Sequence, residues 1–201
     1  MREVRVITGE AAIDRLPMTF TYSQALEVGL TRASLYRLRD DELIHLIARG
    51  LYRRADAPSA DLTLAAVVAR ALQATMCLVT ALARHDLTDE IPGAYDIALP
   101  RGTRRPGIDG PIRWHAFDRD TFDIGRDVIT LDGDVIIGLY SAERSVVDAF
   151  RLRGKEGADV AHEALRRWLR RRGSQPADLM AMASHWPRAV APVRTALQVL
   201  Q

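Results

Sequence analysis

Two short helices joined by a sharp turn are predicted by a few residues between positions 21 and 38. Thr21 and Gln24 stand three positions apart, which is the spacing of a capping box at the start of a helix. Gly29 supplies the left-handed backbone that ends this helix and redirects the chain. Thr31 then caps a second helix. This pattern constrains the N-terminal fold more than any other part of the sequence.

The second helix has one apolar side and one polar side. Leu35 and Leu38 are three positions apart and face the core, whereas Tyr36 and Arg37 point the other way. Ala25 is small at the point where two crossing helices come closest. This spacing is typical of a helix-turn-helix, whose second helix enters the major groove of DNA. An ordinary helical hairpin is the alternative, because Ala-x-x-x-Gly followed by leucines also occurs by chance in Ala-rich chains.

Residues 44–54 form two short apolar strands around an Arg49-Gly50 turn, which predicts a hairpin directly behind the second helix. Helix, turn, helix and hairpin together make a winged helix, whose wing meets phosphates or the minor groove. Arg32 or Arg37 would pair with guanine edges, while wing arginines act mainly on phosphates. The expected DNA contacts are Thr31, Arg32, Ser34, Tyr36 and Arg37 on the second helix, with Arg49, Arg53 and Arg54 on the wing.

Local charge supports this interpretation more than overall charge does. The net charge is only +2 and the isoelectric point is about 9.0, which is weak evidence for nucleic acid binding. Between Thr31 and Arg54, six arginines are opposed by three acidic residues. The basic patch therefore coincides with the predicted DNA-reading segment.

Composition predicts a soluble cytoplasmic protein. Hydrophobic residues make up 48% and charged residues 27% of the chain. No apolar run approaches the roughly 20 residues of a membrane helix, and Met1–Arg5 lacks the apolar core of a signal peptide. The single cysteine, Cys77, cannot form an internal disulfide and is expected to be buried in an apolar helical run.

The expected fold class is α+β, with a winged helix-turn-helix domain over residues 1–57 and a larger mixed domain over residues 58–201. The boundary is placed at the polar, proline-containing segment 55–60. Helical spacing over 61–84, broken near 73–75, opens the second domain. A small sheet follows over 94–139, with strands at 94–99, 112–117, 128–131 and 135–139 and a tight turn at Asp132-Gly133. A helical bundle over 141–200 is predicted from helices at 141–153, 156–172, 176–185 and 188–200.

The sequence offers no catalytic, metal or cofactor motif. It contains no Walker-type phosphate loop and no Gly-x-Ser-x-Gly elbow. Its five histidines are scattered without metal-ligand spacing. A nuclease with an Asp…Glu-x-Lys motif is disfavoured because the only lysine, Lys155, follows Arg153 and Gly154. We therefore expect a protein that is not an enzyme and that uses no cofactor or metal.

Residues 141–165 contain a second informative pattern: Ser-Ala-Glu-Arg-Ser at 141–145, then Asp148, Phe150, a basic cluster, and Gly-Ala-Asp-Val-Ala at 157–161. This stretch resembles the second domain of the AbiEi-type antitoxins. The resemblance covers nearly the whole chain, because that family also begins with a winged helix-turn-helix whose wing contains a Gly-x-Tyr like the one at 50–52. Ser145 stands where the family commonly has threonine.

The resemblance implies a two-domain antitoxin of a bicistronic toxin–antitoxin system. Its partner would be an AbiEii-type nucleotidyltransferase toxin encoded next door. The N-terminal domain would bind inverted repeats in its own promoter as double-stranded DNA and repress the operon. The C-terminal domain would counter the toxin, directly or indirectly, through a surface formed by Arg144, Arg151, Arg153 and Lys155.

Other interpretations stay open. The second domain of a winged-helix regulator could instead sense a small ligand. The arginines between Arg166 and Arg172 form either a solvated helix face or a contact with DNA or a partner. Paired repeats in the DNA suggest two protomers per site. A protein that is a monomer in solution and forms a dimer only on DNA fits this arrangement equally well.

Overall fold

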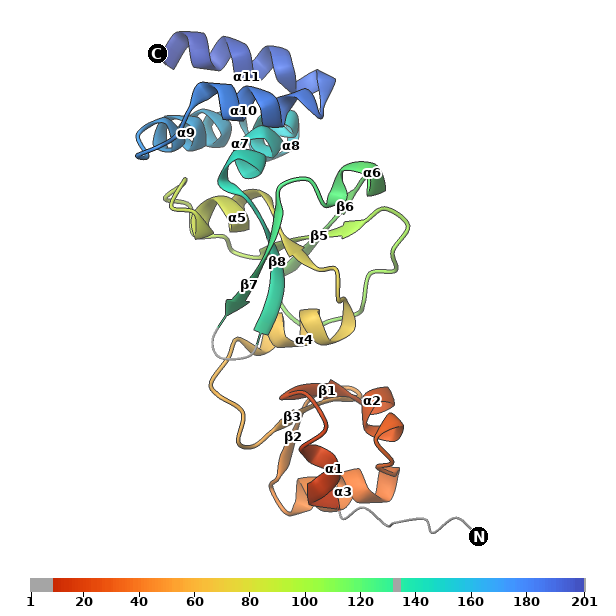
Figure 1. The fold of residues 1–201 in the computed structure, drawn as a ribbon. Coiled ribbons are helices and arrows are strands. Elements are labelled where there is room, and N and C mark those ends of the chain that lie inside the picture. The colour runs from red at the N-terminus through yellow and green to blue at the C-terminus, as the bar shows by residue number, and fades with distance from the viewer. Residues whose placement is uncertain (1–8, 132–134, 201) are drawn as a thin grey trace. The chain divides into compact units, whose positions relative to one another are not determined.

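The computed structural model describes residues 9–131 and 135–200 and shows a mixed α+β protein with two β-sheets (Figure 1). The described residues divide into two compact units. The N-terminal unit runs to Leu72 and also includes Pro106–Gly110 and the described part of Thr130–Ile136. The C-terminal unit contains the other residues. The α+β class expected from the sequence is therefore present.

The turn between the helices over Tyr22–Glu27 and Arg32–Asp40 forms as predicted. At Thr21, the side-chain oxygen accepts from the Gln24 backbone N–H, and the backbone N–H donates to the Gln24 side chain at 2.8 Å. Gly29 has a φ of +89°, which is a left-handed conformation that favours glycine. The elements up to residue 54 are α1 (Gly9–Ile13), β1 (Thr19–Thr21), α2 (Tyr22–Glu27), α3 (Arg32–Asp40), β2 (Ile44–Ala48) and β3 (Leu51–Arg54).

A three-stranded antiparallel sheet in the order β1-β3-β2 completes the first core. The predicted hairpin is present as β2 and β3, with Gly50 at its tip. β1 was not predicted, because a three-residue strand is fixed by its pairing with β3 rather than by its own pattern. Phe20, Leu35, Leu38 and Ile44 are buried between the sheet and the helices.

The N-terminal unit extends past residue 57, where the sequence suggested a boundary. Helix α4 (Leu62–Arg70) packs against β1 and β2. The guanidinium of Arg70 donates to the carbonyl oxygens of Arg49 at 2.6 Å and Gly107 at 2.5 Å. The Pro58 carbonyl oxygen accepts a hydrogen bond from Arg53. Segment 55–60 therefore lies inside this unit rather than at its end.

The second sheet has the strand order β6-β5-β4-β8-β7. The strands are β4 (Thr75–Met76), β5 (Tyr95–Pro100), β6 (Ile112–Phe117), β7 (Arg126–Leu131) and β8 (Val135–Tyr140). The strands expected in the middle of the sequence are all present, whereas β4 replaces the predicted break between two helices. β4 pairs antiparallel with β5, the next strand along the chain, and parallel with β8, which is distant in sequence. The turn predicted at Asp132-Gly133 lies outside the described residues.

Five of the helices described in the C-terminal unit share one core. The helices described there are α5 (Leu78–Arg84), α6 (Arg119–Phe122), α7 (Ala142–Arg151), α8 (Arg153–Glu156), α9 (Ala158–Leu169), α10 (Pro176–Ser184) and α11 (Pro187–Leu200). Residues from α5, α7, α9, α10 and α11 bury a common apolar cluster that includes Phe150, Leu165 and Trp168. The predicted helices of the bundle are therefore confirmed. Cys77 is buried as expected, but it precedes α5 instead of lying within a helix.

Candidate nucleic-acid interface

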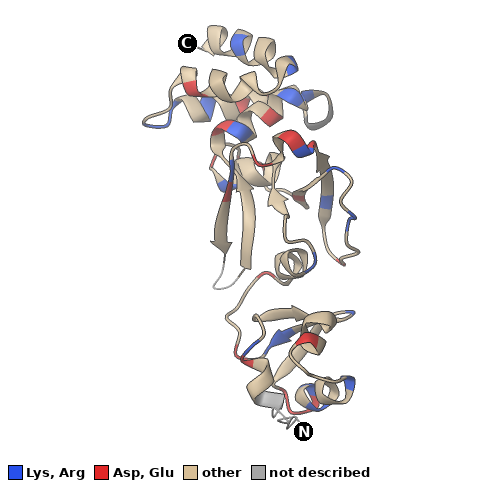
Figure 2. Cartoon of the chain, turned by 45° about the vertical axis from the view of Figure 1, so that its right-hand side comes forward, with Lys and Arg blue, Asp and Glu red and all other residues tan. Residues whose placement is uncertain are grey.

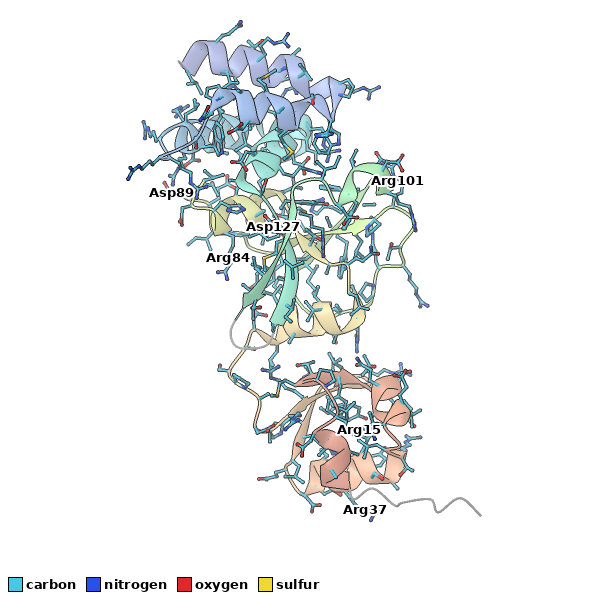
Figure 3. All side chains as sticks on the ribbon, viewed as in Figure 1. Arg15, Arg37, Arg84, Asp89, Arg101 and Asp127 are labelled. Atoms are coloured by element: carbon cyan, nitrogen blue, oxygen red, sulfur yellow. The ribbon has the colours of Figure 1, made fainter. Side chains whose placement is uncertain are left out.

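Helix α3 presents a polar face to solvent. Figure 2 marks the arginines of this helix in blue. Leu35 and Leu38 are buried, and Arg32, Tyr36 and Arg37 are exposed, as the spacing predicts. Successive helical residues are about 100° apart, so Arg37 points away from the direction of Tyr36. Figure 3 shows Arg37 projecting from the outer side of α3. Its guanidinium is therefore accessible to a partner lying along the helix.

The first turn of α3 is held by two hydroxyl groups. The Thr31 Oγ1 accepts from the Ser34 backbone N–H at 3.1 Å, which caps the helix. The Thr31 and Ser34 hydroxyl oxygens are 2.9 Å apart and share a second hydrogen bond. Both residues were predicted to contact DNA. In the free protein they fix the helix start, and Thr31 remains exposed.

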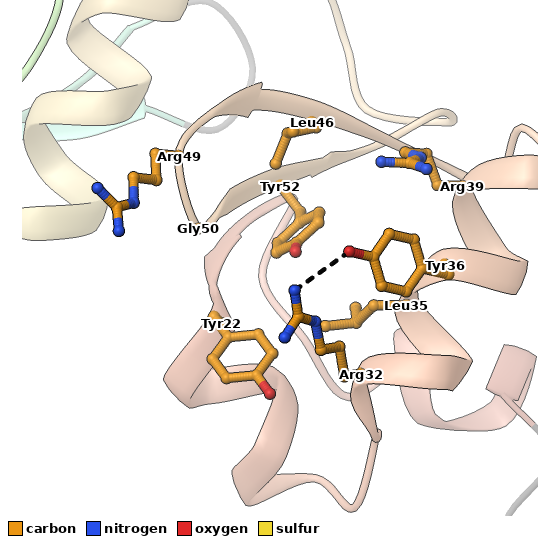
Figure 4. Close-up of a pocket in the computed structure, with 9 residues that line it drawn as sticks. All are labelled: Tyr22, Arg32, Leu35, Tyr36, Arg39, Leu46, Arg49, Gly50 and Tyr52. Carbon is orange, nitrogen blue, oxygen red and sulfur yellow. Dashed lines mark hydrogen bonds between the residues drawn. The ribbon is translucent and has the colours of Figure 1, made fainter.

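An open pocket of about 390 Å³ lies between α3, the start of α2 and the hairpin tip (Figure 4). Its lining residues are Tyr22, Arg32, Leu35, Tyr36, Arg39, Leu46, Arg49, Gly50 and Tyr52. The lining contains arginines and tyrosine hydroxyls but no carboxylate. Guanidinium groups only donate hydrogen bonds, and phenol groups can donate one each. This donor set is suited to an anion.

Tyr36 lies between two arginines of the same helix. The Arg32 Nη2 donates to the Tyr36 hydroxyl oxygen at 3.4 Å (Figure 4). The Arg39 Cζ lies 5.0 Å from the centre of the Tyr36 ring, within the range of a cation–π contact. The hydrogen bond and positive charge of Arg32 lower the pKa of Tyr36 below its usual value of 10.0. Both guanidinium groups therefore contact Tyr36 at the pocket.

The structure keeps only one of the three predicted wing arginines at the pocket. Arg49 is exposed at the hairpin tip and lines the pocket. Arg53 is only 6% exposed and donates to the Thr19 Oγ1 at 2.6 Å, so its predicted role as a wing contact is corrected. Arg54 binds the carboxylates of Asp14 and Asp56, which already compensate its charge. The sequence predicted that Arg53 and Arg54 contact phosphates, but neither side chain is available for that contact.

Three pocket residues with polar side chains, Tyr22, Arg39 and Tyr52, were not among the predicted contacts. Arg39 lies seven positions after Arg32 and three after Tyr36, which is the spacing of one helix face. The sequence therefore contained a signal for Arg39. The place of Tyr22 depends on a tertiary bond, in which its backbone N–H donates to the Gly50 carbonyl oxygen at 2.9 Å. No local pattern could have shown that.

Two of the four residues predicted to form an antitoxicity surface, Arg144 and Arg151, lie largely inside the C-terminal unit. Arg144 is completely buried, so it cannot form part of a surface. Arg151 is largely buried, with a side chain 18% exposed. Arg153 is exposed and donates to the Phe150 carbonyl oxygen at 2.8 Å. Lys155 belongs to α8, and its side chain lies outside the described part of the chain.

Arg144 instead organises a buried polar cluster. Its Nε donates to the Asp148 carboxylate at 2.8 Å, and Asp148 also accepts from the Arg151 Nε at 3.0 Å. The Arg144 Nη1 donates to the carbonyl oxygens of Thr121 and Ile124. The Arg144 Cζ lies 3.9 Å from the centre of the Trp186 ring, within the range of a cation–π contact. These contacts give Arg144 a structural role in the fold.

Within residues 9–131 and 135–200, no group of three or more histidine, cysteine or acidic side chains is arranged to hold a metal ion. The same residues include no helix with the length and apolar character needed to cross a membrane. Comparison with protein-family models gave no match. Comparison with curated proteins also gave no match.

Proposed function

We propose that the N-terminal unit is a winged helix-turn-helix that binds double-stranded DNA. One observation supports this most directly: a pocket of arginines and tyrosines without a carboxylate lies beside the exposed face of α3. DNA presents closely spaced phosphates next to the groove that a recognition helix enters. The pocket offers donors for the phosphates, and α3 offers side chains for the bases.

The proposed roles follow from which residues line the pocket and which lie outside it. Arg39 and Arg49 line the pocket and bind phosphates, which adds affinity without sequence preference. Arg37 projects from the outer face of α3 and reads a guanine edge. Such a bidentate contact is worth about 1–3 kcal/mol of discrimination against a wrong base. Arg32, whose guanidinium donates to the Tyr36 hydroxyl, contacts the DNA where the phosphate backbone meets the base edges.

The resemblance to AbiEi-type antitoxins supports the rest of the proposal. On this basis the DNA is the inverted repeats of the operon's own promoter, and binding represses transcription in the cytoplasm. The C-terminal unit counters a nucleotidyltransferase toxin encoded by the neighbouring gene. Coexpression tests this second activity: growth should be rescued when the chain accompanies that toxin. A folded, abundant chain that leaves the cells arrested would contradict it.

Fluorescence anisotropy across a salt series tests DNA binding. The purified full chain should prefer its own upstream DNA over a scrambled duplex by roughly a thousandfold or more. Arg39→Gln and Arg49→Gln should each lower the slope of log affinity against log salt by about 0.9, with the preference retained. Arg37→Ala should reduce the preference itself. Arg15→Gln is the matched control, because Arg15 is exposed in the same unit but does not line the pocket.

Equal and steeply salt-dependent binding of both duplexes would refute sequence-specific regulation. An unchanged preference in Arg37→Ala would remove the proposed base contact. If Arg15→Gln reduced the salt slope as much as the pocket variants did, the pocket would have no special role.

A further inference from the structure

Positive charge is concentrated in the unit that does not contain α3. Among the described residues, the N-terminal unit has 8 basic and 9 acidic residues, and the C-terminal unit has 18 and 14. DNA affinity at physiological salt depends strongly on the number of phosphates that a protein neutralises. A net negative DNA-reading unit is therefore poorly equipped to hold a duplex alone. The excess charge of the C-terminal unit offers a source of further phosphate contacts.

Much of that excess lies at one end of α9 and in the loop to α10 (Figure 2). We call Arg166, Arg170, Arg171 and Arg172 the α9 arginine surface. All four are exposed. Among the described residues, none of the four has an acidic partner within ion-pair distance. Arg167 differs from them, because its guanidinium binds the carboxylates of Asp89 and Glu163.

The fold does not require this many cations in one place. A cation near the C-terminus of a helix is stabilised by the helix dipole, but this effect is limited to the last turn. Arg166 and Arg170 are four positions apart, where like charges destabilise a helix slightly. Arg171 and Arg172 follow α9 and line a hollow of about 400 Å³. The cluster thus carries repulsion that an anionic partner would relieve.

Two acidic residues share the lining of that hollow, Glu143 and Asp178. The Glu143 carboxylate accepts the Trp168 indole N–H at 3.0 Å, so it is engaged within the protein. Asp178 lies in the first turn of α10, where a carboxylate complements the helix dipole. The net charge of the four arginines and these two acids remains positive.

We infer that the α9 arginine surface is a second DNA contact, which binds backbone phosphates without reading bases. The inference rests on the proposed DNA binding by the N-terminal unit and extends the contact to the C-terminal unit. Its chemistry is that of guanidinium groups with phosphate oxygens, which form paired hydrogen bonds. The contact raises affinity for every duplex and leaves the sequence preference to α3.

The test compares the DNA binding of two variants of the full chain, each with four substitutions, by fluorescence anisotropy in a salt series. The first changes Arg166, Arg170, Arg171 and Arg172 to Gln. The control changes Arg104, Arg105, Arg188 and Arg194 to Gln, which removes the same charge from exposed positions of the same unit. Tryptophan fluorescence in a urea titration verifies that both variants are folded.

The α9 variant should bind its own and scrambled DNA more weakly by the same factor. Its salt slope should fall by about 0.9 for each lost phosphate contact, or roughly 2–4 in total. The control should change the slope by less than half of that. An equal change in both variants would overturn the assignment to this surface. An unchanged salt slope in the α9 variant would also overturn the assignment. If that variant bound DNA normally but failed to neutralise the toxin, the surface would be a protein-docking surface instead. The wild-type chain distinguishes failure of the proposed function from failure of the α9 contact. If the wild-type chain did not prefer its own DNA, the proposed function itself would be refuted.

Discussion

Replacing Asp148 with Asn should strongly destabilise the C-terminal unit. The Asp148 carboxylate is 1% exposed and accepts hydrogen bonds from Arg144 and Arg151. Asn has nearly the same volume but no charge, so two largely buried guanidinium groups lose their counterion. Hydrogen bonds to charged groups contribute about 1.5–3 kcal/mol each, and the Asn carbonyl retains part of one. The expected loss is about 3–5 kcal/mol, the usual cost of removing one partner of a buried ion pair.

Urea denaturation followed by tryptophan fluorescence measures this loss in the correct unit. The three tryptophans, Trp114, Trp168 and Trp186, all belong to the C-terminal unit. With a typical slope of about 2 kcal/mol per molar urea, the midpoint should fall by roughly 2 M. Asp127→Asn is the matched control, because Asp127 is exposed on β7, and its midpoint should move little.

Similar midpoints for Asp148→Asn and Asp127→Asn would refute the argument. A second variant separates charge from packing. Arg144→Met combined with Asp148→Leu removes both charges of the pair, and buried ion pairs replaced by apolar residues are often no less stable. The double variant should therefore be more stable than Asp148→Asn alone.

Three further predictions concern other parts of the chain. Gly29→Ala should destabilise the N-terminal unit by about 1 kcal/mol in thermal denaturation, because φ is +89° there, whereas Gly107→Ala, which has no such φ and also has open space, should be nearly neutral. Burial raises the pKa of Tyr140 above its usual 10.0. The resulting contribution to the free energy of unfolding is complete below about pH 10 and is lost as pH rises above it, so urea midpoints should fall between about pH 10 and 11, and less steeply in Tyr140→Phe. Arg32→Gln should raise the pKa of Tyr36 towards 10, which ultraviolet titration of the tyrosines would detect, and an unchanged titration would contradict the contact.

The start of the chain was predictable because its signals are local. Thr21, Gln24 and Gly29 act within one helical turn of their own positions, and their roles follow from residue type and spacing. The strands of the second sheet carried similar local patterns of apolar residues. β1 and β4 carried none, because strands of two or three residues exist only through their partners.

The errors in the candidate sites have a common cause. The charge of an arginine predicts a surface position, whereas the spacing of Arg53 and Arg144 from buried neighbours indicates burial. Arg53 is two positions after the buried Leu51, and alternate residues of a strand share one face. Arg144 is three positions before Val147, on the buried side of α7, with Asp148 four positions after it. Applying the strand and helix periods to charged residues would have placed both inside.

The position of β4 affects the order in which the protein can be completed during synthesis. This strand lies between β5, which follows within a short stretch of chain, and β8, whose last residue is Tyr140. At typical translation rates of about 5–20 residues per second, roughly 3–13 s separate the appearance of β4 from that of Tyr140. During that interval β4 has an open edge, which is a hazard for pairing with other chains. Translation speed between codons 77 and 140 should therefore influence how much of the protein reaches its native state.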